Sequence, residues 1–517
     1  MASFPTIPKL YAGRCVFITG ATGFMGKNLL EKILRSCPDV KTIYILIRPK
    51  KGKDVGQRLE DLLSSKLFEK LRKEQPSFAS KIQPVTGDIL HDNLGVSQTD
   101  ERLVVDNVSI VFHSAATVKF DEEMKLSVEM NVIGTKRVID FCKKIKNLEA
   151  MLHVSTAYSN CNQKRIEERI YDPPLAPHKL IDACEWMDGD VLNTLTPKMI
   201  GDRPNSYTYT KAIAESLIYQ QCQNMPVVIF RPSIVGASWT EPEPGWVDNY
   251  NGPTGLLAAI GNGVLRIMKG DFDGTSDVIP VDLASKMMIA VAWYTIIEKP
   301  SELKVFHCTT GQINRFTWGN MERMSYEYFM KNPLNMIARI PNPRFTKSTI
   351  WHDINVIFDH MIPAYIMDFY LWMKGRKPIF IKIQDRLRKA VGSLDFFTSN
   401  EWEFSNDNMY MLLNKMSSED RKTFNFDPKC IHWPTYMEQY CLGTKKFVLR
   451  EELAELPKAR KTVQRLQRIN LVTNIILIIV IWRLLINRVS IAKSLWNFLI
   501  GWAIKIFQKL PKVAKSS

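Results

Sequence analysis

The sequence predicts an α/β protein: a doubly wound, Rossmann-type parallel sheet, followed by a smaller helical domain and a C-terminal membrane anchor. Three observations support this prediction. Apolar runs of four to six residues alternate with helical patterns through the first 230 residues, as in a parallel sheet covered on both faces. A glycine-rich turn follows the first run. An aliphatic stretch near the end of the chain is long enough to cross a bilayer.

The first predicted strand covers residues 15–19 and leads through the glycine-rich turn into an amphipathic helical pattern at 28–34. The alternation of strands and helices then continues along the chain and predicts a doubly wound sheet. Five more strands are predicted, at 42–47, 82–85, 108–112, 151–154 and 226–230.

A Pro/Asn-rich stretch at 331–344 predicts a linker or a long surface loop. Beyond it the strand–helix alternation disappears, and aromatic- and Met-rich helical patterns follow at 354–373 and 408–416. We therefore expect a Rossmann-type domain with insertions at 1–345, a helical domain at 346–456, and a basic tail at 457–517.

The net charge of +16 is concentrated in that tail. Residues 458–517 hold 12 Lys+Arg and no Asp or Glu, whereas the other 457 residues hold 57 against 53. A nucleic-acid-binding protein would carry its basic surplus on a folded face, so the distribution argues against nucleic acid as a partner. Nine scattered cysteines, none spaced Cys-x-x-Cys, favour a reducing compartment. The eight histidines show no ligand spacing, and we expect no metal.

The predicted membrane span covers residues 469–487, whose one charge, Arg483, lies near an end. The residues that precede the span favour a single-pass protein whose N-terminal body is cytosolic. They are Lys458, Arg460, Lys461, Arg465 and Arg468. A buried amphipathic helix is the alternative for this segment. Residues 494–508 mix aromatics with lysines and predict an interfacial helix.

The glycine-rich turn has the spacing G-x-x-G-x-x-G and lies between a strand and a helix, which is the context of a dinucleotide site. Its glycines let the backbone approach a pyrophosphate that the helix N-terminus then holds. After the second strand, Arg48 and Lys50 stand where an NAD enzyme has an acidic residue, so NADPH is the expected cofactor. The residues predicted to bind it are Gly20, Thr22, Gly23, Phe24, Met25, Gly26, Arg48, Asp88, Ile89, Tyr207 and Lys211.

Tyr207 and Lys211 are four residues apart and lie on one face of a predicted helix. An ammonium beside a phenol lowers the pKa of the tyrosine, which can then donate a proton to a carbonyl oxygen that accepts hydride. A hydroxyl from the end of the fifth strand would polarise the same oxygen. We assign it to Thr156, with Ser155 as the alternative.

These catalytic residues, together with the glycine motif, resemble the extended short-chain dehydrogenase/reductase family. Four further stretches resemble the fatty acyl-CoA reductases, most closely the animal alcohol-forming enzymes. They are VFHSAATVKFDE (111–122), GDRPN (201–205), RPSIVGAS (231–238) and EPGWVDN (243–249). The likeness extends from about Tyr11 through 441–446 to the anchor.

The resemblance implies that a long-chain (about C16–C18) fatty acyl-CoA is reduced by two NADPH to a primary alcohol and CoA, through an aldehyde, for ether lipid or wax synthesis. It also implies a peroxisomal membrane protein, with the endoplasmic reticulum as the alternative. The Pro/Gly-rich loop 241–249 is a candidate substrate gate, with Trp246, Asp248 and Asn249 as substrate contacts. A membrane-bound hydroxysteroid-type reductase and a non-catalytic NADP-binding scaffold are the remaining alternatives; the oligomeric state is left open.

Overall fold

The computed structural model describes residues 4–488 except 51, together with 494, 496–499, 501 and 502. Its centre is a seven-stranded sheet in the order β11-β7-β5-β4-β1-β2-β3, in which every pair of neighbours is parallel. The strands are β1 (Cys15–Thr19), β2 (Thr42–Ile47), β3 (Ile82–Thr86), β4 (Val108–His113), β5 (Ala150–Val154), β7 (Val227–Pro232) and β11 (Lys304–Cys308). This confirms the predicted doubly wound fold and all six predicted strands, and it adds β11 at one edge.

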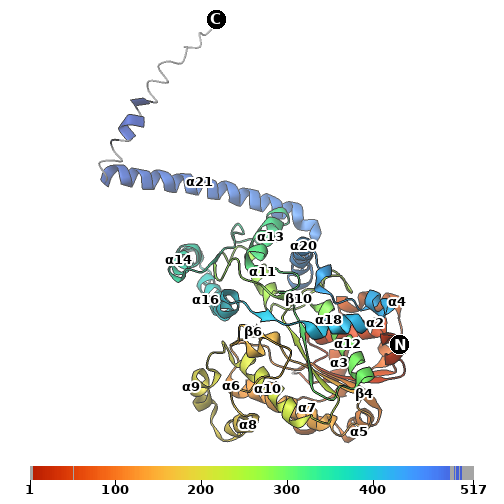
Figure 1. Ribbon diagram of the computed structural model, residues 1–517. Coiled ribbons are helices and arrows are strands. Elements are labelled where there is room, and N and C mark those ends of the chain that lie inside the picture. The colour runs from red at the N-terminus through yellow and green to blue at the C-terminus, as the bar shows by residue number, and fades with distance from the viewer. Residues whose placement is uncertain (1–3, 51, 489–493, 495, 500, 503–517) are drawn as a thin grey trace.

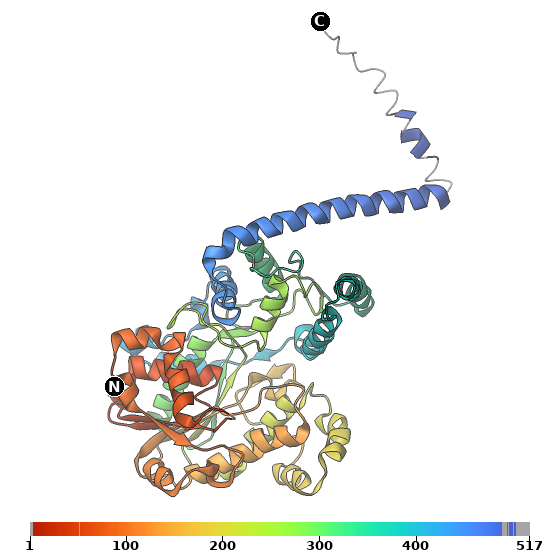
Figure 2. The same cartoon turned by 180° about the vertical axis from the view of Figure 1, so that it is seen from behind.

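Two layers of helices cover the sheet, as Figures 1 and 2 show. One layer holds α1 (Ile7–Tyr11), α2 (Phe24–Ser36) and α12 (Val281–Glu298); the other holds α5 (Gln98–Asn107), α7 (Gly134–Cys142) and α10 (Ser206–Gln221). Strands β1 and β2 are buried along nearly their whole length because both faces are covered. The strand order reverses between β1 and β4, and ligands of such sheets bind at that switch point.

A helical insertion precedes α10. It contains α8 (Pro177–Trp186) and α9 (Gly189–Ile200), which pack with α6 (Met124–Val128) and α10 around Leu180, Leu192 and Tyr209. This small apolar cluster fixes the position of α10, the helix that carries the predicted catalytic tyrosine and lysine.

The chain beyond 345 is mainly helical, as predicted. It comprises α14 (Thr349–Asn355), a π-helical turn (Val356–Met361), α15 (Ile362–Met373), α16 (Phe380–Gly392), α17 (Asp395–Ser399), α18 (Asp407–Lys415), α19 (Ser418–Thr423) and α20 (Trp433–Gly443). Parts of it return to the sheet. The Asn408 side chain donates to the carbonyl of Val305 in β11, and the short strand β13 (Glu403–Phe404) pairs with β6 (Arg165–Ile166) in a separate two-stranded sheet. The remaining elements of the first part are α3 (Val55–Ser64), α4 (Glu69–Glu74), α11 (Pro253–Gly261), α13 (Trp318–Lys331) and the short strands β8 (Ile234–Gly236), β9 (Met268–Lys269), β10 (Val278–Pro280) and β12 (Phe345–Thr346).

The last long helix, α21 (Leu456–Arg488), docks on the body only through its first turns, where Ala459 and Val463 are buried. It then runs out into solvent (Figure 1). Leu453–Arg483 is long and apolar enough to span a membrane, with a mean hydropathy of 1.4 and none of its apolar window buried. The alternative of a buried amphipathic helix is therefore wrong. Most of the predicted interfacial helix at 494–508 lies outside the described residues.

Candidate active site

The glycine-rich turn connects β1 to α2 at the switch point of the sheet. Gly20 has a φ of +76°, and a Cβ there would lie 2.7 Å from the backbone nitrogen of Ala115, just after β4. A Cβ on Gly26 would lie 2.2 Å from the Gly20 carbonyl oxygen. Gly23 is the N-cap of α2 and provides no side-chain cap, so the first N–H groups of the helix are available to a ligand. This backbone fits a pyrophosphate.

The loop 241–249 lies directly against this turn. The indole of Trp246 is 3% exposed and stacks on the Phe24 ring, with centroids 5.2 Å apart. Asp248 forms a 2.6 Å ion pair with Lys27, in the first turn of α2. Asn249 accepts a hydrogen bond from the backbone N–H of Asn251. Trp246 and Asp248 therefore contact the predicted cofactor turn.

Charges fix the start of the same loop. The Glu241 carboxylate lies 2.6 Å from Lys32, 2.9 Å from Arg35 and 3.6 Å from Lys286. Burial opposes its ionisation, but the ammonium groups of Lys286 and Lys32 dominate and hold the pKa of Glu241 at about 2. Asp282 accepts the backbone N–H groups of the three residues 239–241. These contacts hold the loop in place at its start as well as at Trp246.

Two guanidinium groups come together after β2. Arg48, whose side chain is 57% exposed, lies 3.9 Å from Asp88. Arg58, from α3, donates to the Arg48 carbonyl and, at 3.4 Å, to the Thr22 hydroxyl of the glycine turn. Burial and the charge of Arg48 lower the pKa of Arg58. Sequence reasoning missed Arg58, because an arginine within an amphipathic helix carries no signal of its own.

Helix α10 presents Tyr207 and Lys211 beside the carboxyl end of β5. Asn205 caps the helix by accepting the Thr208 N–H at 2.9 Å. The Lys211 ammonium donates to the Val154 carbonyl at 2.8 Å. Burial lowers the pKa of Lys211 to about 8, with Glu215 acting in the opposite direction.

The pKa of Tyr207 behaves differently from the sequence-based expectation. Burial raises it to about 12, while a hydrogen bond with Thr156 lowers it. The expected lowering by Lys211 is not found, because the lysine side chain is directed to the Val154 carbonyl. A tyrosine with this pKa is protonated at neutral pH and can serve as a proton donor.

The two candidate hydroxyls have different partners. Ser155 donates to Glu215 at 2.5 Å, and that carboxylate also accepts two hydrogen bonds, of 2.9 and 2.6 Å, from the fully buried Arg231. Thr156 accepts the Tyr158 N–H at 3.3 Å and reaches the Tyr207 phenol. Ser155 thus belongs to a buried charged network, and Thr156 lies with the tyrosine.

Asn131 is a second residue that sequence reasoning missed. It lies in a π-helical turn (Glu129–Ile133), and π-helical turns are frequent at functional sites. Its buried amide accepts from the Thr117 N–H at 3.0 Å and donates to the Thr210 hydroxyl of α10 at 3.0 Å. It therefore positions α10 against the segment after β4.

Aromatic rings from the distant C-terminal region complete the surroundings of Tyr207. Phe120 lies 5.8 Å from the Tyr207 ring, and Phe397 of α17 stacks on Phe120 at 5.3 Å. The Trp402 indole donates to the Cys161 carbonyl at 2.9 Å. Burial raises the pKa of the Cys161 thiol to about 11, as expected of a packing residue rather than a nucleophile.

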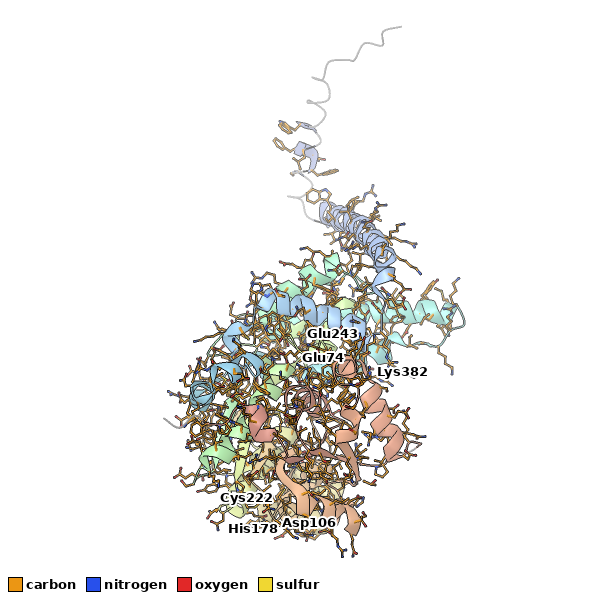
Figure 3. The ribbon with its side chains drawn as sticks, turned by 90° about the vertical axis from the view of Figure 1, so that its right-hand side faces the viewer. Glu74, Asp106, His178, Cys222, Glu243 and Lys382 are labelled. Atoms are coloured by element: carbon orange, nitrogen blue, oxygen red, sulfur yellow. The ribbon has the colours of Figure 1, made fainter. Side chains whose placement is uncertain are left out.

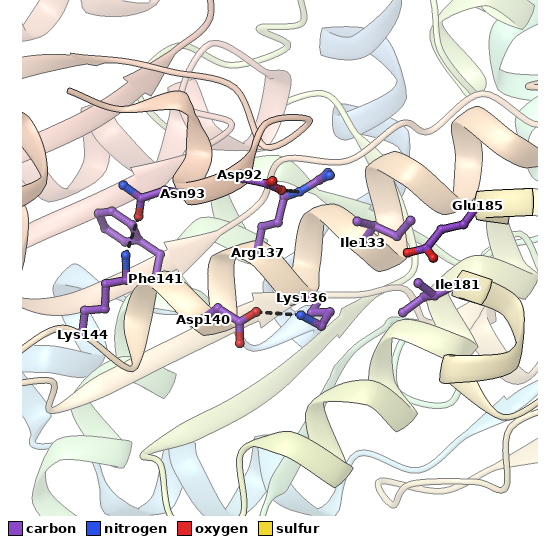
Figure 4. Close-up of a pocket in the computed structure, with 10 residues that line it drawn as sticks. All are labelled: Asp92, Asn93, Ile133, Lys136, Arg137, Asp140, Phe141, Lys144, Ile181 and Glu185. Atoms are coloured by element: carbon purple, nitrogen blue, oxygen red, sulfur yellow. Dashed lines mark hydrogen bonds and ion pairs between the residues drawn. The ribbon is translucent and has the colours of Figure 1, made fainter. Parts of the chain in front are cut away.

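A separate cleft lies along α7 and is not lined by any of the predicted site residues (Figure 4). Its charged side chains largely satisfy one another: Lys136 pairs with Asp140 at 2.9 Å, and Arg137 pairs with Asp92 at 3.1 Å. We therefore assign no binding role to this cleft.

The parallel sheet, the uncapped glycine turn at its switch point and the Thr-Tyr-Lys group beside it define an oxidoreductase of the short-chain dehydrogenase/reductase type, which uses a nicotinamide cofactor. Solved structures share the fold. They include a reductase domain of a non-ribosomal peptide synthetase from Mycobacterium tuberculosis (TM-score 0.56, 17% identity, 86% of this chain and 94% of the other) and the terminal R domain of the myxalamid PKS-NRPS pathway (TM-score 0.54, 18% identity, 86% and 92%).

Sequence comparison identifies the family. An NAD-binding family model described as male sterility protein matches residues 18–288, and a second model with the same description matches 359–451. Fatty acyl-CoA reductase 1 of Mus musculus and of Homo sapiens are each 46% identical over 500 residues, covering 97% of both chains. Fatty acyl-CoA reductase 2 of Mus musculus is 42% identical over 503 residues, covering 96% of this chain and 97% of the other. The chain belongs to the fatty acyl-CoA reductase family.

Proposed function

We propose that this oxidoreductase reduces a long-chain (about C16–C18) fatty acyl-CoA to a primary fatty alcohol and CoA, with two NADPH consumed per alcohol and an aldehyde as the intermediate. The observation that carries the proposal is that the Tyr207 phenol has Thr156 as its hydrogen-bond partner and the Phe120 ring as its neighbour. The full-length relatedness to fatty acyl-CoA reductases supports the substrate class.

Each residue of the site has a defined task. A bound nicotinamide cofactor would supply the hydride that the carbonyl carbon accepts. Tyr207 holds a proton on its phenol oxygen, since its pKa of about 12 keeps it protonated at neutral pH, and delivers that proton to the substrate oxygen. Thr156 orients the phenol and stabilises the developing negative charge. Lys211 would hold the ribose hydroxyls of the bound cofactor, and the glycine turn would hold its pyrophosphate.

The preference for NADPH rests on Arg48, with Lys50 and Arg58 beside it. A guanidinium group binds a phosphate through two parallel hydrogen bonds, and Arg58 already contacts the turn through Thr22. Asp88 and Ile89 follow β3, and we propose that they border the adenine. NADH lacks the 2′-phosphate and would give these cations no anionic partner, so NADH should be the poorer cofactor.

The C-terminal candidate span suggests a membrane protein. We propose a single pass with the catalytic body in the cytosol, in the peroxisomal membrane, with the endoplasmic reticulum as the alternative; the alcohol would feed ether lipid or wax synthesis. The domain boundaries at 345 and 456 stay predictions. So do the substrate contacts of Trp246, Asp248 and Asn249, for which the proximity of Trp246 to Phe24 is the supporting contact.

The test is NADPH oxidation with C16–C18 acyl-CoA and identification of the product. Tyr207→Phe should abolish turnover while cofactor binding survives. Tyr209→Phe is the matched control, because the Tyr209 hydroxyl is buried without a hydrogen-bond partner among the described residues and lies two positions along the same helix.

Other outcomes distinguish the alternatives. Alcohol formation at an undiminished rate in Tyr207→Phe would refute the assigned proton donor. Aldehyde as the sole product would limit the enzyme to one reduction. Retained NADPH binding with no turnover of acyl-CoA or of a ketosteroid would support a scaffold, and turnover of the ketosteroid alone would support the hydroxysteroid type.

A further inference from the structure

Residues 349–392 form a projecting group of helices with an unusually apolar surface. It consists of α14, the following π-helical turn, α15 and α16, and we call it the apolar hairpin. Its exposed side chains are mostly large and hydrophobic: Ile350, Trp351, Ile354, Ile357, Phe358, Ile362, Tyr365, Ile366, Met367, Phe369, Tyr370, Trp372, Met373, Ile379 and Ile383. Soluble proteins rarely expose apolar patches larger than a few hundred Å², and larger patches mark interaction sites.

Polar contacts, not a core of its own, hold the hairpin in shape. The Asp359 carboxylate pairs with Arg266 at 3.1 Å and with Arg344. The Asp368 carboxylate accepts the backbone N–H groups of Ile379, Phe380 and Ile381, at 2.7–2.9 Å, and so ties α15 to the start of α16. The apolar side chains are therefore displayed by a defined structure rather than by a loose chain.

Basic residues border the apolar surface. Residues 374–389 contain seven Lys or Arg, all exposed, and one acidic residue, Asp385. The Lys374 ammonium lies 5.9 Å from the centre of the Tyr370 ring. Aromatic and aliphatic side chains next to exposed cations are the composition of segments that lie in the interface of an anionic bilayer.

The hairpin also lies on the side of the body from which the candidate span leaves. Figures 1 and 2 show α14, α16 and the outer part of α21 projecting on the same side of the body. Lys382, which lies in α16, is labelled in Figure 3. A span in a bilayer would keep this side of the body close to the lipid surface.

We propose that the apolar hairpin docks on the surface of an anionic bilayer, with its aromatic and aliphatic side chains among the acyl chains and its cations at the headgroups. The chain would then contact the membrane at two places, α21 and the hairpin. This inference is independent of the reaction catalysed, because it uses surface chemistry and position alone.

The test uses the full chain reconstituted in nanodiscs that contain anionic lipid. Eight of the nine cysteines are buried, so Cys430→Ser removes the exposed thiol. A single cysteine carrying an environment-sensitive fluorophore is then placed by Trp372→Cys, by Ile478→Cys in the candidate span, or by Trp186→Cys on α8 as the control, since Trp186 is 73% exposed. Brominated acyl chains quench a fluorophore that lies in the bilayer, and aqueous iodide quenches one that is exposed to water.

We expect the label at 372 to shift to shorter wavelength and to lose most of its emission to brominated lipid, as the label at 478 does, while the label at 186 stays open to iodide. Charge reversal by Lys382→Glu should reduce the lipid quenching at 372, and Lys198→Glu on α9 should not.

A label at 372 that iodide reaches as readily as the label at 186 overturns the proposal. A wavelength shift without lipid quenching also overturns it, because a second copy or another segment would then cover the hairpin. Quenching at 372 but not at 478 supports the hairpin and refutes the span, so the two membrane contacts are tested separately.

Discussion

The assignment of the catalytic hydroxyl gives the sharpest single test. Ser155 and Thr156 are adjacent, yet Ser155 donates to Glu215 at 2.5 Å whereas Thr156 reaches the Tyr207 phenol. We predict that Thr156→Val, which keeps the shape and removes the hydroxyl, loses activity with little change in stability. Ser155→Ala should instead lower the stability with little change in activity.

The expected magnitudes follow from the partners. Loss of one donor that stabilises a developing oxyanion lowers kcat by about 10²–10³, or about 2.7–4 kcal/mol. In Ser155→Ala the Glu215 carboxylate keeps its two hydrogen bonds from Arg231 and loses one. A buried hydrogen bond to a charged group contributes about 1.5–3 kcal/mol, which should appear in the free energy of unfolding.

The assay measures kcat with acyl-CoA and the unfolding midpoint of each variant side by side. Thr156→Ser is the matched control, because it restores a hydroxyl at the same Cβ and should recover most of the activity. If Ser155→Ala loses activity at unchanged stability while Thr156→Val keeps it, the assignment is reversed and our reading of the Glu215 network is incorrect.

Four further predictions use other parts of the site. Gly26→Ala should abolish cofactor binding, measured by calorimetry, because its Cβ would lie 2.2 Å from the Gly20 carbonyl oxygen; normal affinity would refute the close packing of the turn. Arg48→Ala should raise the KM for NADPH about ten- to a hundredfold and that for NADH little, as expected for loss of one charged hydrogen-bonding partner; an equal change for both cofactors would remove Arg48 from the phosphate site. The rate should fall above about pH 8 as Lys211 loses its proton, and Lys211→Arg should shift this fall to higher pH. The free energy of unfolding should increase from pH 8 to 10.5, because in that range the unfolded chain still holds the lysine proton that the folded protein has lost. The Glu241 carboxylate, whose pKa drops from 4.5 to about 2, stabilises the fold above pH 4.5 and progressively less as the pH falls toward 2, so Glu241→Gln should lower Tm at pH 7 and weaken its acid dependence.

The centre of the fold was predictable because its signals are local. Cys15–Thr19 and Thr42–Ile47 are continuous apolar runs, and the structure has both strands at the predicted bounds. β11 was missed because only two apolar residues stand between Lys304 and His307, and because the preceding α12 is buried on all sides and gives no clear helical pattern. Burial of a polar side chain such as His307 depends on partners that the local sequence does not reveal.

In the site too, the features with local sequence signals were predictable and those formed by long-range contacts were not. Glycine spacing and the Tyr207–Lys211 interval are short patterns with a mechanism, so the sequence predicts them. Phe397 reaches the surroundings of Tyr207 from 190 positions further along the chain, and Arg58 reaches the glycine turn from a helix of ordinary composition. Which long-range contacts form is decided by how whole elements pack, and no local pattern carries that information.

The return of the C-terminal region to the sheet has a consequence for how the protein folds. Asp420 accepts the backbone N–H of Ile7, and Cys441 belongs to the same apolar core as Val16. The N-terminal half therefore cannot complete its core until synthesis has passed about residue 440, and such high contact order slows folding. During that time the apolar strands lack their final cover, so the nascent chain should depend on chaperones until shortly before its membrane segment is made.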